Sequence, residues 1–243
     1  MASLDGHSLT LVCIERVMVR SMTRLRTIPN PDALTPSALA AALQARPYTE
    51  HPALPGRKNH IRCGVLVPLR WNPEPEVIVT RRVQELKHGG EWCFPGGRPE
   101  EGDKDLFETA CREGREELGL NDVALLGRLT SMPLGTSDYR IEPFVVQSHD
   151  TTLNPDPSEV AEVLALPLLE ALAVVQTPGL PFDWDGAVHY SPLYPLGQRY
   201  LFGASAHTFR ELIEVASSIV GLSPPRVVET DLTWEGIVKS ARG

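Results

Sequence analysis

Residues 94–120 read FPGGRPEEGDKDLFETACREGREELGL, and this stretch decides the fold prediction. Within it, Asp105–Leu118 contains no proline, and Asp103 or Asp105 can cap the start of a helix. Residues spaced at about 100° around a helix sort into distinct faces. One face is apolar or small and would pack on a sheet: Phe107, Cys111, Gly114 and Leu118. The stretch therefore predicts an amphipathic helix over Asp105–Leu118.

Three carboxylates share another sector of this helix. Glu113, Glu116 and Glu117 fall within about 100° of one another around its axis. Like charges three or four residues apart repel by about 0.2–0.5 kcal/mol per pair. A bound Mg²⁺ would remove that repulsion, because it takes hard oxygen ligands. A solvated acidic face is the alternative, and the helix alone does not separate the two interpretations.

Paired glycines precede the helix. Gly96 and Gly97 join a strand-like segment to the loop before Asp105. Glycine can adopt a positive φ, and it lets the backbone approach a ligand or an ion closely. This turn therefore favours a binding site over a merely solvated helix face.

The whole stretch resembles the signature of the Nudix hydrolase family, which is G, five residues, E, seven residues, then R-E-U-x-E-E-x-G-U, where U is bulky and apolar. Here Gly97 and five residues precede Asp103, and residues 112–120 match the second half. Asp103 stands where Glu is usual, eight residues separate it from Arg112, and Gly114 replaces a bulky residue. The first two departures are similar to the variant signature of the coenzyme A diphosphatase branch. Gly114 fits neither form, and we expect it to weaken the helix by about 1 kcal/mol.

The resemblance extends beyond this stretch, over about residues 30–220. Upstream, Ile78–Val83 partly matches the branch motif L-L-T-x-R-S, with valine in place of the serine. Lys87 replaces an arginine of that motif, and the stretch after it is one residue short. Downstream, residues 141–145 and 154–163 are similar to a later strand of the branch and its Glu-Val turn. The upstream departures bear on the substrate rather than on the fold.

The resemblance implies a fold and a reaction. The fold is α/β (α+β), a Nudix-type α/β/α sandwich with a mixed β-sheet between helices. The reaction is metal-dependent hydrolysis of a diphosphate linkage in coenzyme A or an acyl-CoA, giving 3′,5′-ADP and (acyl-)4′-phosphopantetheine. The alternative is the same reaction on another nucleoside diphosphate derivative, such as ADP-ribose, a dinucleotide or a capped RNA. A third interpretation is a catalytically silent Nudix-like ligand sensor.

The matched positions imply the metal site. Glu113, Glu116 and Glu117 would bind Mg²⁺ or Mn²⁺ together with the carbonyl group of Gly97. Such ions bridge phosphate oxygens and acidify a bound water. Glu113 and Glu116 are therefore predicted as catalytic residues as well as metal ligands.

A further acid from a distant loop often joins this site in the family. Glu159 and Glu162 are both candidates for the general base, and an ordinary helix-capping role is the alternative for each. Guanidinium groups suit phosphate, although a surface pair at a strand end is the alternative for the two arginines. The predicted substrate-binding positions are Arg81, Arg82, Gly96 and Gly97.

Composition excludes several classes. The 243-residue chain has a formal net charge of −8, which opposes a general DNA- or RNA-binding surface. Glu100–Glu117 holds eight acids and three bases, so much of the acidic excess lies in the predicted metal-binding segment.

The sequence contains no run of about 18 apolar residues, so no membrane helix is predicted. Four cysteines without a Cys-x-x-Cys pair argue against structural zinc and favour a reducing cytoplasm. The expected partner is a small-molecule diphosphate, and the family resemblance leaves a homodimer open.

We predict three regions: an N-terminal extension over residues 1–30, a Nudix hydrolase domain over residues 31–222 and a C-terminal tail over residues 223–243. Phe182–Phe202 holds six aromatic residues that could stack on adenine or fill a core. The predicted helices are Ser37–Gln44 and Ala204–Val220. The predicted strands are Ile61–Leu69, Glu76–Arg82, Val123–Thr130 and Asp138–Gln147. Helical or mixed character is predicted for Glu159–Leu164 and Pro167–Val175.

Overall fold

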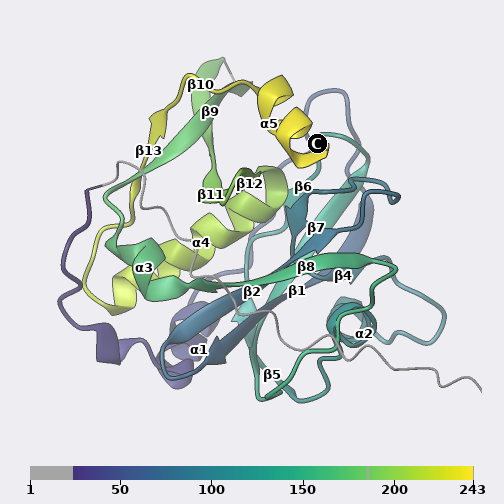
Figure 1. Cartoon of the computed structure of the whole chain (residues 1–243), viewed down its shortest axis with the longest axis horizontal. Helices are drawn as coiled ribbons and strands as arrows, with labels where there is room; N and C mark the ends of the chain where they lie inside the picture. The colour runs from purple at the N-terminus through teal and green to yellow at the C-terminus, as the bar shows by residue number, and fades with distance from the viewer. Residues whose placement is uncertain (1–23, 185, 243) are drawn as a thin grey trace, which may run out of the picture.

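A mixed β-sheet forms the centre of the molecule (Figure 1). The computed structural model describes residues 24–184 and 186–242. The central strand order is β3-β2-β1-β7-β5, and β4, β6 and β8 pair with β1, β7 and β2. The pair β1 and β7 is parallel, and the other pairs are antiparallel. The bounds are β1 Ile61–Trp71, β2 Pro75–Arg82, β3 Trp92–Cys93, β4 Gly96–Gly97, β5 Val123–Arg128, β6 Met132–Pro133, β7 Tyr139–Ser148 and β8 Val160–Pro167.

Helices cover both faces of this sheet. Alternate residues of a strand point to opposite faces, so β1 contributes to two cores. Val65 and Val67 pack with α1 (Pro36–Gln44), α3 (Leu168–Ala173) and α4 (Gly203–Ile219). Leu66 packs in the second core, beneath α2 (Leu106–Leu118), and Figure 1 shows α4 and α2 on opposite sides of the strands. The fold is thus the predicted α/β/α sandwich.

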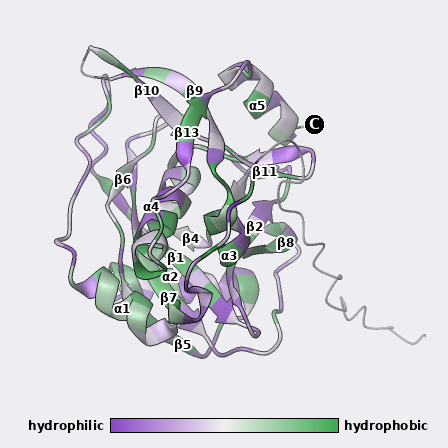
Figure 2. Cartoon of the chain, turned by 90° about the vertical axis from the view of Figure 1, so that its left-hand side faces the viewer, coloured by the Kyte–Doolittle hydropathy of each residue, from purple (hydrophilic) through white to green (hydrophobic). Residues whose placement is uncertain are grey.

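Local sequence signals set the starts of the first two helices. The hydroxyl of Thr35 accepts a hydrogen bond from the Ala38 N–H at 3.1 Å, and Pro36 is the first residue of α1. Asp105, rather than Asp103, caps α2, because its carboxylate accepts a hydrogen bond from the Glu108 N–H at 2.8 Å. Figure 2 shows that hydrophobic and polar residues both occur along α1 and α4.

The helical or mixed character predicted for Glu159–Leu164 is wrong in its helical part. Residues 160–167 form strand β8, which pairs antiparallel with β2. The pairing matches Leu164 with Val79 and Ala165 with Ile78. Leu164 and Val79 belong to the core beneath α1, α3 and α4, whereas Ala165 and Ile78 belong to the core beneath α2. Tertiary pairing outweighs helix propensity here. The predicted helix after it exists as α3.

The C-terminal part of the chain adds strands beyond the central sheet. The predicted aromatic segment 182–202 is shared among two hairpins, and Tyr194 packs edge-on against Phe209 of α4 at 4.8 Å between ring centroids. Within the predicted tail, β13 pairs in parallel with β9, and α5 buries Ile237 and Ala241. The bounds are β9 Gln176–Trp184, β10 Ala187–Pro192, β11 Tyr194–Leu196, β12 Arg199–Leu201, β13 Arg226–Glu229, α5 Trp234–Arg242 and the short helix η1 Pro31–Ala33.

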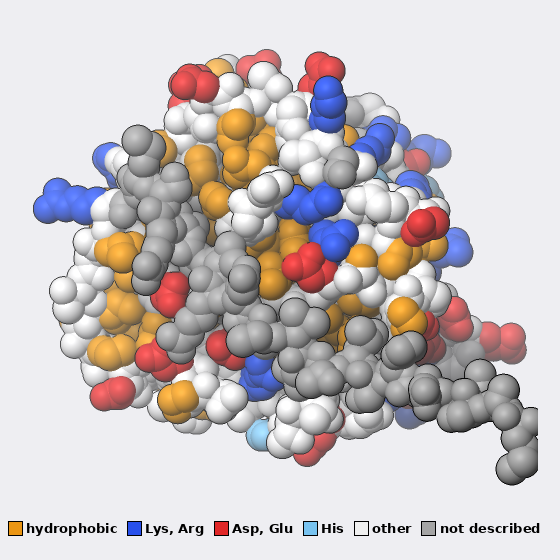
Figure 3. Space-filling view, in the orientation of Figure 1, with side chains coloured by type: hydrophobic (Ala, Val, Ile, Leu, Met, Phe, Trp, Pro, Cys, Tyr) orange, Lys and Arg blue, Asp and Glu red, His pale blue; other side chains and the backbone are white. Residues whose placement is uncertain are grey.

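Most of the predicted N-terminal extension, residues 1–23, lies outside the described residues. The described part of it contacts the domain, since the Arg26 N–H donates to the Ala173 carbonyl at 2.8 Å. None of the helices in the described part of the chain is long and apolar enough to cross a membrane. Acidic and basic side chains both lie on the face drawn in Figure 3.

Candidate active site

Two glycines let α2 approach the sheet closely. A Cβ atom at Gly64 of β1 would lie 2.2 Å from the Leu106 carbonyl oxygen. A Cβ atom at Gly114 would lie 2.7 Å from Cδ2 of Leu66. Gly114 therefore makes room for β1, which is the physical reason for its departure from the family pattern. Its cost in helix propensity is offset by the packing of α2 on the sheet.

Gly96 and Gly97 bring the backbone against two of the predicted metal ligands. Neither glycine has a positive φ, so the predicted conformational reason is wrong for this turn. The predicted close approach is present instead: a Cβ atom at Gly97 would lie 2.2 Å from Oε1 of Glu113. The Gly96 N–H donates a hydrogen bond of 3.2 Å to Oε1 of Glu117.

Glu117 is a buried carboxylate whose charge is balanced by one distant ion pair and one backbone hydrogen bond. Its side chain is 2% exposed. Burial raises its pKa to about 7, while the Gly96 N–H and the charge of Arg82 oppose that rise and the charges of Glu113 and Glu159 add to it. A buried carboxylate that other carboxylates surround is a ready ligand for a hard cation, because the cation removes both penalties.

Arg112 binds the other two predicted ligands. Its Nη2 lies 3.0 Å from Oε1 of Glu113, and its Nη1 lies 2.8 Å from Oε2 of Glu116. The same guanidinium contacts Asp103 at 3.3 Å. Arg112 occupies carboxylate oxygens of these acids, and no three potential metal-binding side chains converge within residues 24–184 and 186–242. The donor set still fits a hard divalent cation, since every side chain in it supplies carboxylate oxygens, and Glu113 and Glu116 would turn from Arg112 to bind it.

The sheet separates the two arginines and the two acids that the sequence leaves equivalent. Arg82 faces α2, with Nη1 at 4.0 Å from Glu117 and Nη2 at 4.0 Å from Glu159. Arg81 points to the other face, where its Nε lies 2.9 Å from Oε2 of Glu162. The structure thus brings Arg82 and Glu159 to the α2 site, and it leaves Arg81 and Glu162 away from it.

A cleft of about 660 Å³ lies beside Glu113. It is lined by His60, Ile61, Arg62, Arg98, Pro99, Glu100 and Glu113. The sequence analysis missed Arg62 and Arg98 as lining residues. A signal existed for Arg62, since it lies two residues before Gly64 and strand periodicity places both on the face of α2. Arg98 directly follows Gly97, so the sequence also indicated that Arg98 lies beside the glycine turn.

The sequence model of one protein family, described as NUDIX domain, matches residues 60–185, which is just over half of the chain. The chain belongs to the Nudix family. As a Nudix hydrolase it acts on pyrophosphate bonds of a diphosphate-containing substrate, as predicted, and this family generally uses divalent metal ions.

Curated relatives carry the same family name. The chain is 32% identical over 155 residues to "Uncharacterized Nudix hydrolase NudL" of Pectobacterium atrosepticum, in a match that covers 62% of this chain and 80% of the relative. It is 33% identical over 161 residues to the protein of that name from Yersinia pestis (strain Pestoides F), with 64% and 80% covered.

Solved Nudix structures are more distant. A NUDIX hydrolase from Nitrosomonas europaea is 16% identical, with a TM-score of 0.44 and a match covering 70% of this chain and 79% of that one. A C. elegans Ap4A hydrolase in a binary complex is 15% identical, with a TM-score of 0.37 and coverage of 45% and 83%.

Proposed function

We propose that this Nudix hydrolase cleaves the diphosphate of coenzyme A or an acyl-CoA, giving 3′,5′-ADP and (acyl-)4′-phosphopantetheine. The observation that carries the reaction is the buried Glu117 carboxylate, which lies with Glu113, Glu159 and Arg82 around the Gly96 turn. Support for the substrate comes from the sequence GGRPEEGD at residues 96–103 and TACRE at residues 109–113, which are similar to the coenzyme A diphosphatase branch.

Mg²⁺ or Mn²⁺ would be bound by Glu113, Glu116 and Glu117, with the carbonyl of Gly97 as a further ligand. When bound, such an ion neutralises phosphate charge and makes a water more acidic. Glu117 would need no large movement to bind the cation, because the Gly96 N–H already orients its carboxylate. Glu113 and Glu116, which now pair with Arg112, would supply carboxylate oxygens to the cation, and Arg112 would keep its contact with Asp103.

Glu159 is our candidate for the general base. It lies on the α2 side of the sheet, its side chain is 44% exposed, and Arg82 links it to Glu117 at 4.0 Å on either side. An exposed carboxylate at the edge of the site can take a proton from water and return it to solvent. Arg82, from the same cluster, would bind a non-bridging phosphate oxygen of the substrate. Glu162 stays paired with Arg81 on the other face and has no part in this proposal.

The test is a substrate panel with the purified protein, Mg²⁺ or Mn²⁺, and a Glu117→Gln variant. Coenzyme A should be hydrolysed with a higher kcat/KM than ADP-ribose, dinucleotides or capped RNA, and Glu117→Gln should remove the activity. A preference for ADP-ribose would overturn the coenzyme A assignment. Binding of a panel member without any turnover would instead indicate a ligand sensor.

A reducing cytoplasm and a homodimer stay predictions. The described cysteines Cys63, Cys93 and Cys111 are free thiols. The homodimer is checked by light scattering of the purified chain, where a mass of one protomer would contradict it.

A further inference from the structure

One wall of the cleft beside Glu113 presents guanidinium groups. Arg62 from the start of β1 and Arg98 from the turn after Gly97 both line it. The exposed side chain of Arg98 forms no hydrogen bond or ion pair with another residue of the described chain, whereas the nearby Arg112 pairs with Asp103, Glu113 and Glu116. Arg98 is therefore a cation that the fold does not use.

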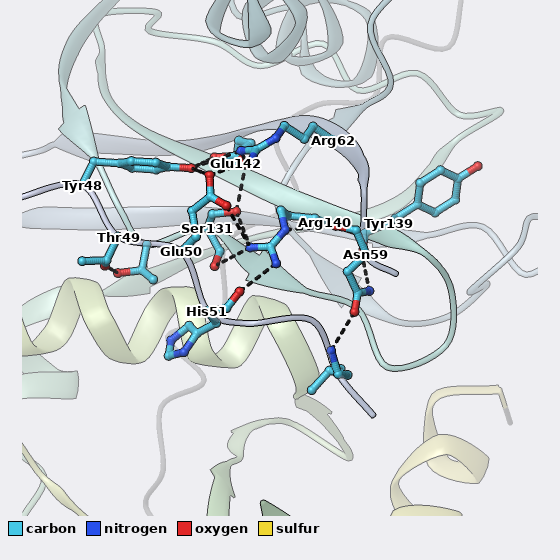
Figure 4. Close-up of polar contacts among 12 residues, drawn as sticks. Tyr48, Thr49, Glu50, His51, Asn59, Arg62, Ser131, Tyr139, Arg140 and Glu142 are labelled. Carbon is cyan, nitrogen blue, oxygen red and sulfur yellow. Dashed lines mark hydrogen bonds and ion pairs between the residues drawn. The ribbon is translucent and has the colours of Figure 1, made fainter. Parts of the chain in front are cut away.

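Arg62, which lines the same cleft, is held by several polar contacts (Figure 4). Its Nη2 donates to Oε1 of Glu50 at 2.6 Å, and its Nη1 donates to the hydroxyl of Tyr48 at 3.2 Å. Nη1 also pairs with Glu142. Even with these contacts, 41% of the Arg62 side chain remains exposed, so a ligand can still reach it.

The anchor of Arg62 is a fully buried carboxylate. Glu142 is 0% exposed, and besides Arg62 it accepts hydrogen bonds from Ser131 Oγ at 2.9 Å, Tyr48 Oη at 2.9 Å and Arg128 Nη2 at 3.1 Å. Burying an ion cluster is expensive, and well-packed apolar residues often serve stability as well or better. Stability is thus a weak reason for this cluster, and fixing a guanidinium in the cleft wall is a stronger one.

The cluster carries a surplus of positive charge. The guanidiniums of Arg62, Arg128 and Arg140 face the carboxylates of Glu50 and Glu142, which leaves one positive charge uncompensated. Arg98 adds a second. Two acids also line the cleft: the exposed Glu100, 4.0 Å from Arg112, and Glu113, which belongs to the proposed metal site.

We propose that Arg62 and Arg98 form a binding site for a phosphomonoester of the substrate, separate from the diphosphate that is cleaved. A phosphomonoester carries a charge of about −2, and planar guanidiniums such as those of Arg62 and Arg98 bind phosphate oxygens in pairs. The cleft, about 660 Å³, is within the size range of small-molecule sites. The inference rests on the proposed function for the identity of the substrate, whose diphosphate would lie at the α2 carboxylates.

The first experiment compares coenzyme A with 3′-dephospho-coenzyme A, which lacks only the phosphomonoester. The wild-type protein should favour coenzyme A in kcat/KM by about 10-fold or more, because charged hydrogen bonds are lost with the missing group. Arg98→Gln should abolish most of that preference through KM. The matched control is Lys104→Gln, which removes an exposed cation outside the cleft lining and should keep the preference. Equal kcat/KM for the two substrates in the wild type overturns the proposal, as does an equal loss for both in Arg98→Gln.

The role of Arg62 needs a milder variant, because its removal would leave Glu142 under-compensated in the interior. Arg62→Lys keeps the charge but loses the planar pair of donors. We expect the variant to fold, as checked by circular dichroism, and to retain less than half of the wild-type preference for coenzyme A. An unchanged preference in this variant removes Arg62 from the site.

A binding experiment separates failure of this inference from failure of the proposed function. Calorimetry with adenosine 3′,5′-bisphosphate and with AMP, both in Mg²⁺, measures the phosphomonoester contribution without any turnover. The bisphosphate should bind about 10-fold more tightly to the wild type and no more tightly than AMP to Arg98→Gln. If no diphosphate is hydrolysed but this difference is found, the proposed function fails and the binding site stands. Equal affinities for the two probes overturn the binding site even where coenzyme A is hydrolysed.

Discussion

Nη1 of Arg82 lies 4.0 Å from Oε1 of Glu117, and this is the ion pair available to the buried carboxylate. No other cationic side chain in the described ranges forms an ion pair with Glu117. The contact is long, and Arg82 divides its guanidinium between Glu117 and Glu159. Glu117 is therefore poorly compensated without a metal ion, and the metal-free protein should be strained at this residue.

Glu117→Gln should stabilise the metal-free protein at high pH. Burial raises the Glu117 pKa from 4.5 to about 7, so the native state holds a proton that the unfolded state has lost. Stability from this group is present below the unfolded pKa and declines as pH rises through the folded one, by up to about 3 kcal/mol. Denaturant unfolding in EDTA at about pH 5 and about pH 8 measures it. The variant should be the more stable protein at the higher pH, and equal stabilities there would contradict the prediction.

Glu159→Gln should lower kcat by about 100-fold or more, the usual contribution of a general base. Glu162→Gln should change kcat by less than about threefold, because its surface ion pair with Arg81 lies on the opposite face of the sheet. The two changes are chemically identical, so steady-state kinetics of the pair isolates position as the cause. A larger loss in Glu162→Gln than in Glu159→Gln would show that we have placed the base on the wrong face.

Gly97→Ala should impair catalysis more than stability. Its Cβ atom would lie 2.2 Å from Oε1 of Glu113, and the end of that flexible side chain would have to move. We expect a higher metal concentration for half-maximal activity, with kcat/KM reduced by about 10-fold, because a displaced ligand misplaces the reacting groups. Gly135→Ala is the matched control, since its Cβ would meet only Leu54 at an ordinary 3.8 Å. Titration of activity with Mg²⁺ on both variants checks the prediction, which fails if they behave alike.

Gly114→Leu, which restores the bulky residue usual at this position of the family, should destabilise this protein. The side chain would meet Cδ2 of Leu66, 2.7 Å from the position of its Cβ. Overpacking of a core costs about 1–3 kcal/mol, more than the gain in helix propensity of about 1 kcal/mol. Leu66→Ala in the same chain should recover part of the loss. A double-mutant cycle by denaturant unfolding measures the coupling, and strictly additive effects would argue against this contact.

His207 should make the protein less stable in mild acid. Burial lowers its pKa from 6.5 to about 4, and the charges of His51 and Arg210 act in the same direction. The imidazole, which contacts Ser191 Oγ at 3.0 Å, stays neutral in the native state while the unfolded state binds a proton. Stability from this group is thus present above the unfolded pKa and is lost as pH falls toward about 4, by up to about 3 kcal/mol.

The variant His207→Gln checks this prediction beside His189→Gln, which alters an exposed histidine of β10. The difference in unfolding free energy between wild type and His207→Gln should shrink as pH falls from about 7 to about 4. The corresponding difference for His189→Gln should stay nearly constant. A parallel change in both would assign the effect to general charge rather than to His207.

The sequence by itself determined the features that depend on neighbours along the chain. Thr35 and Asp105 cap helices through hydrogen bonds to residues three positions later. The spacing of Glu113, Glu116 and Glu117 places them on one sector of α2 for the same local reason. The family signature is also read along the chain, and the resemblance that it carries implied the sandwich fold and the reaction class. Helix periodicity and capping need no knowledge of distant partners.

Only the tertiary structure decided which side chains meet. The sequence left Glu159 and Glu162 equivalent, but their separate ion pairs with Arg82 and Arg81 place them on opposite faces of the sheet. The burial of Glu117 depends on the packing of α2 against the sheet. The guanidinium wall of the cleft joins residues far apart in sequence. These features arise from pairing and close approach between segments, which local propensities do not encode.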